Sequence, residues 1–322
     1  MNVFITGASG FIGRAFLGAL RPLLAAGDTA FCLSRRPAAA PAPGEAWLTG
    51  DLENPGTFRQ ELLAADIVFH IAGEPELSAS EDRAALNYTS TRALLSTLKE
   101  SGRIKKFVYI SSIAAAGRRP GPITGPMRSG ESFPPDSAYG RSKRLAEGAV
   151  AAAGIPFTIF RPSFVYGAGM RPRSHINRFV SLAVRNSPLA LLDFPGRLPL
   201  IHVEDLALAL AGALAPGAPS GGTYSALTES RTAGEIFSLI LTSLNGRTPP
   251  RLPLPKLNRL PAFLRSAVPA GALALLSDYF WTEDAAFRAD FMKAAVPRRI
   301  EDSIRDVIDS NPDFRAQAKG RA

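Results

Sequence analysis

Short apolar segments alternate with longer helical segments through the first half of this chain of 322 residues. The apolar segments have the length of buried strands, and the segments between them carry apolar residues at helical spacing. Such alternation predicts parallel strands joined by right-handed crossovers, with helices on both faces of the sheet. Six strands are expected within residues 3–5, 29–36, 46–52, 65–73, 105–117 and 156–162, and helices within residues 11–20, 55–64, 80–102 and 137–154. The predicted fold class is therefore α/β, with a doubly wound parallel sheet.

The alternation becomes looser from about Phe164 onward, where prolines and short elements replace it. This change predicts a smaller, mostly helical part that covers the edge of the sheet where ligands bind. We therefore expect the sheet in residues 1–163, with some later segments returning to it, and a substrate-binding cap in residues 164–322.

Three glycines, Gly7, Gly10 and Gly13, stand between the first strand and the first helix. Glycine costs conformational entropy on folding, so a cluster of glycines indicates that side chains would obstruct a close approach. The turn precedes a helix, where free backbone N–H groups and the helix dipole stabilise an anion. The spacing predicts a phosphate-binding turn, and a tight strand-to-helix connection without a ligand is the alternative.

The formal net charge of +9 favours acidic partners. The arginines are scattered along the chain and are not interleaved with aromatic residues, so we expect no nucleic-acid-binding module. A phosphorylated cofactor or a small-molecule substrate is favoured, and a generally solvated basic surface is the alternative.

The single cysteine, Cys32, excludes an internal disulfide and favours a reducing compartment. No signal peptide is apparent at the start of the sequence. The longest apolar tract, residues 267–276, is too short to span a bilayer and contains Pro269. We expect a cytoplasmic protein without an integral membrane segment.

Tyr139 and Lys143 are four residues apart in the segment YGRSK, which is predicted to be helical. This spacing places both side chains on one helix face, where the ammonium group can favour ionisation of the phenol. Ser112 ends the segment FVYISS of the expected strand and should lie at the same edge of the sheet. The three residues together indicate proton transfer, whereas the Tyr–Lys pair by itself is typical of a helix surface.

Several motifs occur in one order: TGASGFIG, GDL, HIAG, NYTSTRALL, ISSIAAAG, YGRSK, RPSFVYG and HVEDLA. In these motifs the chain resembles the extended short-chain dehydrogenases/reductases, the NAD(P)-dependent epimerase/dehydratase group, from Met1 to about Leu214. The resemblance implies a Rossmann-type fold and an oxidoreductase or epimerase that transfers hydride at a secondary alcohol or ketone. The C-terminal third matches only loosely.

The same resemblance implies the residues of the active site. Tyr139 would be the catalytic acid/base, Lys143 would lower the tyrosine pKa and hold the nicotinamide ribose, and Ser112, rather than Ser111, would bind the reacting oxygen. Ala116 replaces the usual aromatic residue of the serine motif, which removes a ring from the pocket wall. His70 is interpreted as structural, and no metal site is expected from the spacing of His70, His175 and His202.

The implied cofactor site extends over the N-terminal half of the chain. Arg35 and Arg36 follow the second strand, where an acidic residue would bind the ribose of NAD and arginine would bind the 2′-phosphate of NADP. NADP(H) is therefore favoured over NAD(H), although surface arginines are the alternative. The expected cofactor-binding residues are Gly7, Gly10, Phe11, Ile12, Gly13, Arg35, Arg36, Asp51, Leu52, Ile71, Ala72, Gly73, Asn87, Lys143 and Pro162.

We expect a nucleotide sugar as the substrate, although the sequence does not fix its identity. The family favours a nucleotide sugar, but Leu198 stands where many such relatives carry an arginine that grips the diphosphate. One alternative is a reductase or dehydrogenase of a less polar ketone, similar to the flavonol-reductase or hydroxysteroid branch. Another is a non-catalytic dinucleotide-binding scaffold, which the retained Ser112, Tyr139 and Lys143 disfavour. The family also implies a possible homodimer.

Overall fold

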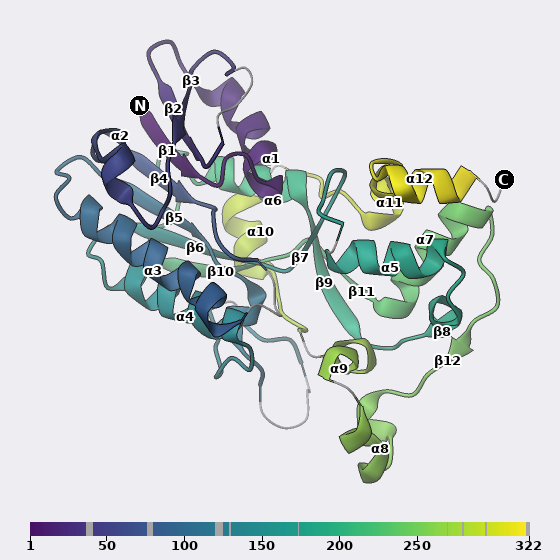
Figure 1. Cartoon of the computed structure of the whole chain (residues 1–322). Helices are drawn as coiled ribbons and strands as arrows, with labels where there is room; N and C mark the ends of the chain where they lie inside the picture. The colour runs from purple at the N-terminus through teal and green to yellow at the C-terminus, as the bar shows by residue number, and fades with distance from the viewer. Residues whose placement is uncertain are drawn as a thin grey trace.

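A computed structural model describes residues 1–36, 41–75, 80–119, 125–128, 130–172, 174–268, 270–278, 280–293 and 295–319. Two lobes lie side by side (Figure 1), the first built on a large sheet and the second on helices around small sheets. Residues 37–40, which follow Arg35 and Arg36 in the chain, lie outside the described residues.

The first lobe contains a seven-stranded sheet in which every paired strand is parallel. In spatial order its strands are β10 (Gly222–Ala226), β6 (Phe157–Pro162), β5 (Lys106–Ile110), β4 (Ile67–His70), β1 (Asn2–Thr6), β2 (Thr29–Ser34) and β3 (Glu45–Thr49). The chain leaves β1 in opposite directions, to β2 on one side and later to β4 on the other. The carboxyl ends of β1 and β4 therefore form the switch point where such sheets bind ligands. The predicted doubly wound parallel sheet is confirmed.

Helices cover both faces of this sheet. One face packs against α1 (Phe11–Leu20), α6 (Val203–Gly212) and α10 (Ala285–Phe291), and the other against α2 (Arg59–Leu63), α3 (Glu81–Leu98) and α4 (Ala138–Ala151). Successive side chains of β1 point to opposite faces of the sheet. Ile5 lies in the core on the α1 side, and Phe4 lies in the core on the α3 side. These cores, rather than the loops, fix the positions of the strand ends.

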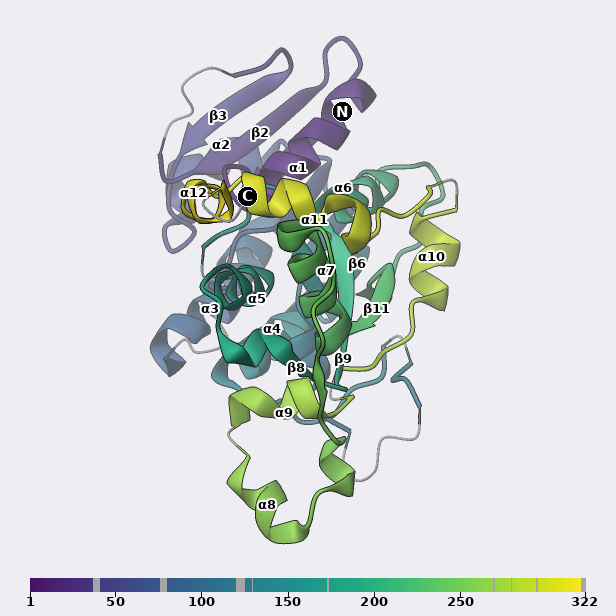
Figure 2. The same ribbon diagram turned by 90° about the vertical axis from the view of Figure 1, so that its right-hand side faces the viewer.

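The second lobe is mostly helical, as predicted, but it also contains short strands that the sequence analysis missed. A three-stranded sheet contains β7 (Phe164–Tyr166), β9 (Arg197–His202) and β11 (Glu229–Thr232), and β8 (Leu192–Asp193) pairs with β12 (Leu252–Pro253). The helices are α5 (His175–Val184), α7 (Ala233–Asn245), α8 (Ala262–Ala267), α9 (Ala270–Leu276), α11 (Ile300–Asp309) and α12 (Pro312–Lys319). Figure 2 shows α5, α7 and α11 close together, and they share one apolar core.

Five 3₁₀ turns complete the described elements: η1 (Arg21–Leu23), η2 (Pro55–Phe58), η3 (Ile113–Ala116), η4 (Pro188–Leu191) and η5 (Leu257–Arg259). Two of them shorten predicted elements. The strand expected over residues 105–117 ends at Ile110, because Ser112 accepts a hydrogen bond from the Ala114 N–H and starts η3. The helix expected over residues 55–64 is η2 followed by α2.

Three elements that follow residue 163 pack with the first lobe. β10 extends the large sheet beside β6, α6 packs against α1, and α10 packs against α6 and β10. No helix in the described part of the chain combines the length and the apolar composition needed to cross a membrane.

Candidate active site

The glycine turn between β1 and α1 is folded too tightly for side chains. Gly7 has φ +71°, and a Cβ added there would lie 2.7 Å from the Ala72 nitrogen. A Cβ on Gly13 would lie 2.1 Å from the Gly7 carbonyl oxygen. Gly10 donates a hydrogen bond to that oxygen (2.9 Å) and precedes the first residue of α1. The turn therefore brings bare backbone to the N-terminus of a helix, where an anion is stabilised.

Residues next to the turn hold it against both lobes. Phe11 packs against the core of the second lobe, and Ile12 and Ile71 pack against the core of the first. The Ala72 N–H donates to the Thr6 hydroxyl (3.1 Å), which ties the segment after β4 to the end of β1. The turn is thus held from two sides before any ligand binds.

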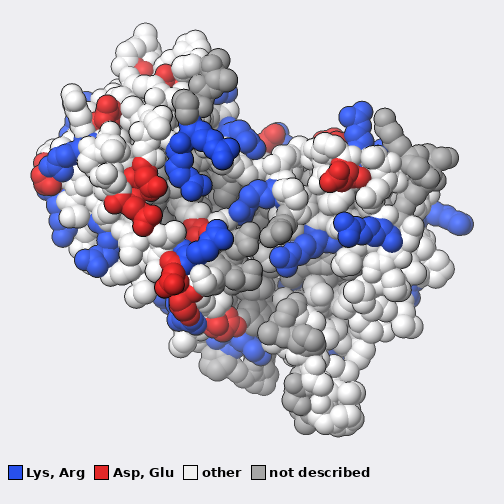
Figure 3. Space-filling model, in the orientation of Figure 1, with Lys and Arg blue, Asp and Glu red and all other residues white. Residues whose placement is uncertain are grey.

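An open cavity of about 990 Å³ lies beside the turn, at the end of β2. Its described lining contains no acidic residue and consists of Ser9, Arg14, Leu17, Arg21, Ser34, Arg35, Arg36 and Trp47. The hydroxyls of Ser9 and Ser34 lie 3.1 Å apart, and Ser34 also accepts the Arg36 N–H (3.2 Å). Arg14, Arg35 and Arg36 are exposed, so the cavity is electropositive and open to water. In Figure 3, Lys and Arg side chains lie on either side of the hollow between the lobes.

Tyr139 lies in the first turn of α4, whose N-cap Ser137 accepts the Gly140 N–H (3.0 Å). The Tyr139 side chain is buried and forms a hydrogen bond with the Ser112 side chain. Burial raises the pKa of Tyr139, while Ser112 and the positive charge of Arg171 act in the opposite direction. The structure therefore brings Ser112, at the end of β5, to the phenol.

Lys143 lies one helical turn after Tyr139 and is 4% exposed. Its Nζ donates to the Ile110 carbonyl (2.9 Å) and lies 4.9 Å from the centre of the Tyr109 ring. Burial lowers the pKa of Lys143 to about 7, and the Glu147 carboxylate acts against this shift. A Cβ on Gly73 would lie 3.1 Å from the Lys143 Nζ, so glycine at that position leaves room for the ammonium group.

Asn87 in α3 clamps the chain just after Gly73. Its Oδ1 accepts the Glu74 N–H (2.9 Å), and its Nδ2 donates to the Glu74 carbonyl (3.1 Å) and the Ser142 hydroxyl (3.2 Å). Asn87 is 1% exposed, so these bonds form away from water. The clamp fixes the segment after β4 relative to α4, which carries Tyr139 and Lys143.

His70 is buried at the end of β4 and has hydrogen-bond partners on both ring nitrogens. Thr91 donates its hydroxyl proton to the Asn87 carbonyl (2.6 Å), so it accepts from His70 Nε2 (3.0 Å). Nδ1 of the neutral ring then accepts from the Thr6 hydroxyl (2.7 Å). Burial, aided by the charge of Lys143, lowers the pKa of His70 to about 3. The ring connects the glycine turn to the Asn87 clamp, in agreement with its structural interpretation.

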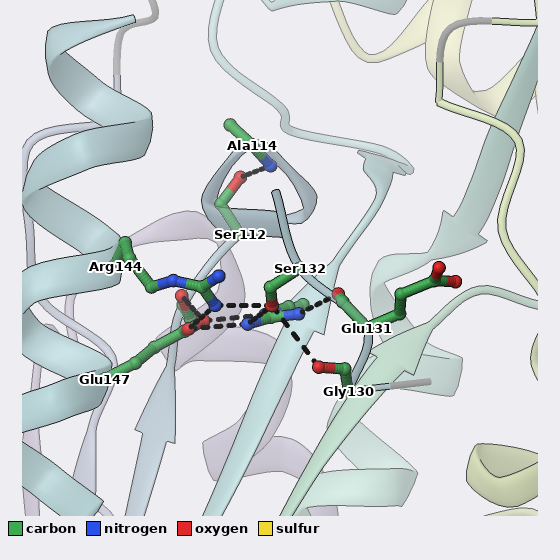
Figure 4. A network of polar contacts seen from close by, with 9 residues as sticks. Ser112, Ala114, Gly130, Glu131, Ser132, Arg144 and Glu147 are labelled. Carbon is green, nitrogen blue, oxygen red and sulfur yellow. Dashed lines mark hydrogen bonds and ion pairs between the residues drawn. The ribbon is translucent and has the colours of Figure 1, made fainter. Parts of the chain in front are cut away.

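The sequence analysis missed a buried ionic network behind the site (Figure 4), built around Glu147 of α4. Glu147 accepts from Arg161 Nε (2.8 Å) and Nη2 (2.7 Å) and from the Ser111 hydroxyl (2.6 Å). Ser132 and Arg144 join the same network. Ser111 is thus bound to Glu147, which leaves Ser112 for Tyr139. An arginine inside the apolar strand FTIFRP was the available signal for this network.

The family model described as "NAD dependent epimerase/dehydratase family" matches residues 3–226. The chain belongs to this family. Ceramide reductase of Caulobacter vibrioides is 31% identical over 215 residues, which are 65% of this chain and 59% of that protein. Sterol demethylase protein B of Methylococcus capsulatus is 26% identical over 79% of this chain and 78% of its own length. The chain thus spans less than two thirds of the reductase.

Among solved structures, the dTDP-glucose 4,6-dehydratase of Bacillus anthracis in complex with NAD superposes with a TM-score of 0.74. The match covers 98% of each chain at 19% sequence identity. This likeness concerns the fold, and it extends the agreement from the matched residues 3–226 into the second lobe.

Several family positions lie away from the cavity and the Tyr139 cluster. Asp51 is exposed after β3 and accepts the Glu53 N–H (3.0 Å). Leu52 packs against the core on the α3 side of the sheet. Pro162 is buried at the end of β6, opposite Ala226 of β10. No described contact joins these three residues to the cavity or to Tyr139.

An apolar wall stands beside Ser112 and combines both lobes. Ile113, Ala116 and Met127 form a buried cluster against which Phe133 and Phe280 pack. The Phe280 ring lies 5.4 Å from that of Phe164, measured between ring centres. Ala116 therefore belongs to a cluster against which two aromatic rings from other segments pack.

Arg171 is the other residue that the sequence analysis did not single out. It follows β7 in the second lobe, and its carbonyl accepts from Asn177 Nδ2 (3.0 Å). Its charge acts on Tyr139 against that of Glu74 from the first lobe. Among the described residues, no group of His, Cys, Asp and Glu is arranged to hold a metal ion.

Proposed function

We propose that this chain is an NADP(H)-dependent oxidoreductase that interconverts a ketone and a secondary alcohol. The buried cluster of Ser112, Tyr139 and Lys143, next to a glycine turn that leaves no room for side chains, carries this proposal. The residues present fit a dinucleotide, because bare backbone meets a helix N-terminus beside an electropositive cavity. When bound, the nicotinamide ring supplies or accepts the hydride.

The side chains of the cluster divide the proton chemistry among them. The Tyr139 hydroxyl gives a proton to the oxygen of a reduced ketone and takes it back in the reverse direction. Ser112 donates a hydrogen bond to the same oxygen while its Oγ stays fixed by the Ala114 N–H (3.2 Å). Lys143 lies one helical turn after Tyr139 on α4, and we assign its charged form the role of favouring the ionised phenol. The charges that act on the pKa of Tyr139 in this structure are those of Arg171 and Glu74.

The cavity lining supports NADP(H) as the preferred cofactor. Arg35 and Arg36 directly follow β2, and Arg14 reaches the same cavity from α1. The planar guanidinium group suits phosphate oxygens, and the hydroxyls of Ser9 and Ser34 add further donors. An acidic residue that would bind the free 2′-hydroxyl of NAD does not occur among the described lining residues.

A less polar ketone is the substrate class that we favour. The wall beside Ser112 is apolar, with Ile113, Met127 and Phe280 in contact. Leu198, where nucleotide-sugar enzymes of the family often carry arginine, is buried in the second-lobe core. The names of two relatives, ceramide reductase and sterol demethylase protein B, also refer to lipids.

A nucleotide sugar is the second candidate. Arg171 acts on Tyr139 from the second lobe, and a guanidinium group there could bind a phosphate of the substrate. The superposed dehydratase is named for such a substrate. The two candidate substrates differ in the group that would contact the second lobe. A nucleotide sugar would place a phosphate there, and a lipophilic ketone would place a hydrocarbon chain there.

Calorimetric titration of the full chain with NADPH and NADH tests the cofactor. We expect NADPH to bind more tightly and the double variant Arg35→Ala/Arg36→Ala to lose about 10- to 100-fold of that affinity, as removal of two phosphate contacts would cause. The control Arg305→Ala/Arg315→Ala, which removes two exposed arginines of α11 and α12, should bind NADPH like the wild type. Absence of binding to either nucleotide would overturn the enzymatic proposal in favour of a scaffold.

A second assay then separates the substrate classes. NADPH oxidation is followed with long-chain ketones in detergent and, in parallel, with keto forms of nucleotide sugars. Turnover that Tyr139→Phe abolishes, with lipophilic ketones only, supports the favoured class. Turnover with nucleotide sugars only, together with a raised KM in Arg171→Ala, would replace it with the second candidate.

A further inference from the structure

A projection stands out from the second lobe below α9 in Figures 1 and 2 and contains α8 at its end. We define the α8–α9 projection as residues 256–278. Its base is closed by an ion pair between Lys256 Nζ and Asp278 Oδ2 (2.8 Å). On the inner side, Gly196 donates its N–H to the Leu275 carbonyl (2.8 Å), and Leu276 packs against the second-lobe core. The projection is therefore anchored at its base and along α9.

The outer end of the projection exposes large apolar side chains. Phe263 is 71% exposed and Leu264 is 43% exposed, although they are neighbours in α8. Leu252, four residues before the projection, is 63% exposed. A single exposed apolar residue is common on soluble proteins, but adjacent large ones on a protruding element mark a contact surface.

The sequence around the projection is mostly basic, and Asp278 at its base is the one acidic residue between Gly246 and Asp278. From Gly246 to Ser277 the chain contains no aspartate or glutamate, and its basic residues are Arg247, Arg251, Lys256, Arg259 and Arg265. The Arg251 side chain is only 8% exposed and donates to the Ser238 hydroxyl and the Leu192 carbonyl, so it does not face a ligand. Arg259, in η5 beside α8, is exposed, whereas Lys256 is neutralised by Asp278 at the base. Apolar residues flanked by basic ones match the surface of an anionic bilayer, where rings enter the headgroup layer and cations meet lipid phosphates.

The projection leads directly into the wall of the candidate active site. Phe280 follows its last residue by two positions and packs beside Ile113, the neighbour of Ser112. The next residues are held to the first lobe, since the Met127 N–H donates to the Trp281 carbonyl (2.9 Å) and the Glu283 N–H donates to the Met127 carbonyl (2.9 Å). A surface bound at α8 therefore lies on the same stretch of chain as Phe280, which packs in the apolar wall beside Ser112.

We propose that the α8–α9 projection docks the protein on an anionic lipid bilayer, from which the active site takes a membrane-borne ketone. The inference rests on the proposed function for the nature of the substrate. A second copy of the chain suits the projection less well, because a stable dimer buries about 800 Å² on each partner. Two apolar side chains on a helix of six residues offer much less than that.

Vesicle flotation with the full chain tests the docking. We expect the protein to float with vesicles of phosphatidylcholine and phosphatidylglycerol, and about tenfold less with phosphatidylcholine alone, because lipid anions add to the apolar contact. The variant Phe263→Asp/Leu264→Asp should lose flotation about tenfold. The control Leu23→Asp/Leu208→Asp, which places the same two charges on exposed leucines of η1 and α6, should float like the wild type.

Two further measurements distinguish a loss of membrane docking from a loss of cofactor binding or catalysis. The Phe263→Asp/Leu264→Asp variant should bind NADPH and reduce a detergent-dispersed ketone like the wild type, while reduction of the same ketone in anionic vesicles falls about tenfold. Absence of wild-type flotation overturns the docking even if NADPH binds. A wild-type dimer in light scattering that this variant converts to a monomer, without flotation, assigns the projection to a second copy. Flotation without NADPH binding would instead leave the docking and remove the proposed function.

Discussion

The two ends of the candidate cofactor site use positive charge in opposite ways. At the β2 end, Arg14, Arg35 and Arg36 are exposed around an open cavity. At the α4 end, Lys143 is 4% exposed and is held by the Ile110 carbonyl and the Tyr109 ring. The exposed arginines keep their hydration and cost the fold little, whereas the buried lysine is desolvated and its pKa falls to about 7.

The two environments give the two kinds of charge different roles. An exposed guanidinium group contributes affinity for an anion that arrives from water, and its strength depends on salt. A buried ammonium group is kept at a cost in stability, which is typical of groups that act on a reaction. We expect three measurable effects on activity or stability, and the variant at the buried end should show the largest.

Lys143→Met should lower kcat by about three orders of magnitude, because it removes the ammonium group to which the proposed mechanism assigns the ionisation of Tyr139. The same variant should raise the free energy of unfolding of the apoprotein at pH 7 by about 1–3 kcal/mol, since a buried charge is replaced by a thioether of similar length. Loss of the hydrogen bond to the Ile110 carbonyl offsets part of this gain. Steady-state kinetics and chemical unfolding measure the two effects.

The pH dependence of unfolding provides the control for Lys143→Met. The pKa of Lys143 is about 7 in the folded chain and 10.5 at its ordinary value. Between these values the unfolded chain binds more protons, so wild-type stability from this group rises as pH increases from 7 to 10.5. The methionine variant lacks this rise, and its stability advantage should shrink at high pH. An advantage that is equal at pH 7 and pH 10 would contradict the buried-charge explanation.

Asn87→Ala should have an intermediate effect at the same end of the site. The change removes three hydrogen bonds that hold Glu74 and Ser142, leaving the Glu74 N–H and carbonyl without this partner. We expect the free energy of unfolding to fall by about 2–3 kcal/mol and kcat to fall by about tenfold to a hundredfold. NADPH affinity, measured by calorimetry, should change much less than kcat. A loss confined to affinity would show that the clamp serves binding rather than alignment.

The sequence predicted the first lobe well, because its signals are local. The alternation of strands and helices predicted the parallel sheet. The glycine spacing predicted the turn at Gly7 and Gly13, where the structure leaves no room for a side chain. The missed strand β10 joins β6 from more than 50 residues away, and its Gly222, Thr223 and Ser225 weaken the apolar pattern. Pairing between distant segments is not encoded in the periodicity of either segment.

Only the residues of the candidate site that belong to a local sequence motif could be predicted from the sequence. The positions of Tyr139 and Lys143 follow from their spacing on one helix, but the effect of Arg171 on Tyr139 depends on how the second lobe packs. Likewise, Ala116 alone indicates a lost ring, whereas the fold places Phe133 and Phe280 around it. Contacts between lobes arise from tertiary packing, so a reading of one segment at a time does not find them.

We expect the smallest effect from a change in salt concentration. Salt should weaken cofactor binding at the exposed arginines of the β2 end without affecting the buried Lys143. Raising NaCl from about 0.05 to 0.5 M should increase the KM for NADPH about three- to tenfold, because screening weakens the attraction of Arg14, Arg35 and Arg36 for phosphate. The value of kcat should change less than about twofold, since Lys143 is shielded from ions by its burial. The KM of Arg35→Ala/Arg36→Ala should depend on salt much less than that of the wild type. If kcat and KM respond equally, the two ends do not differ in their access to solvent as the structure describes.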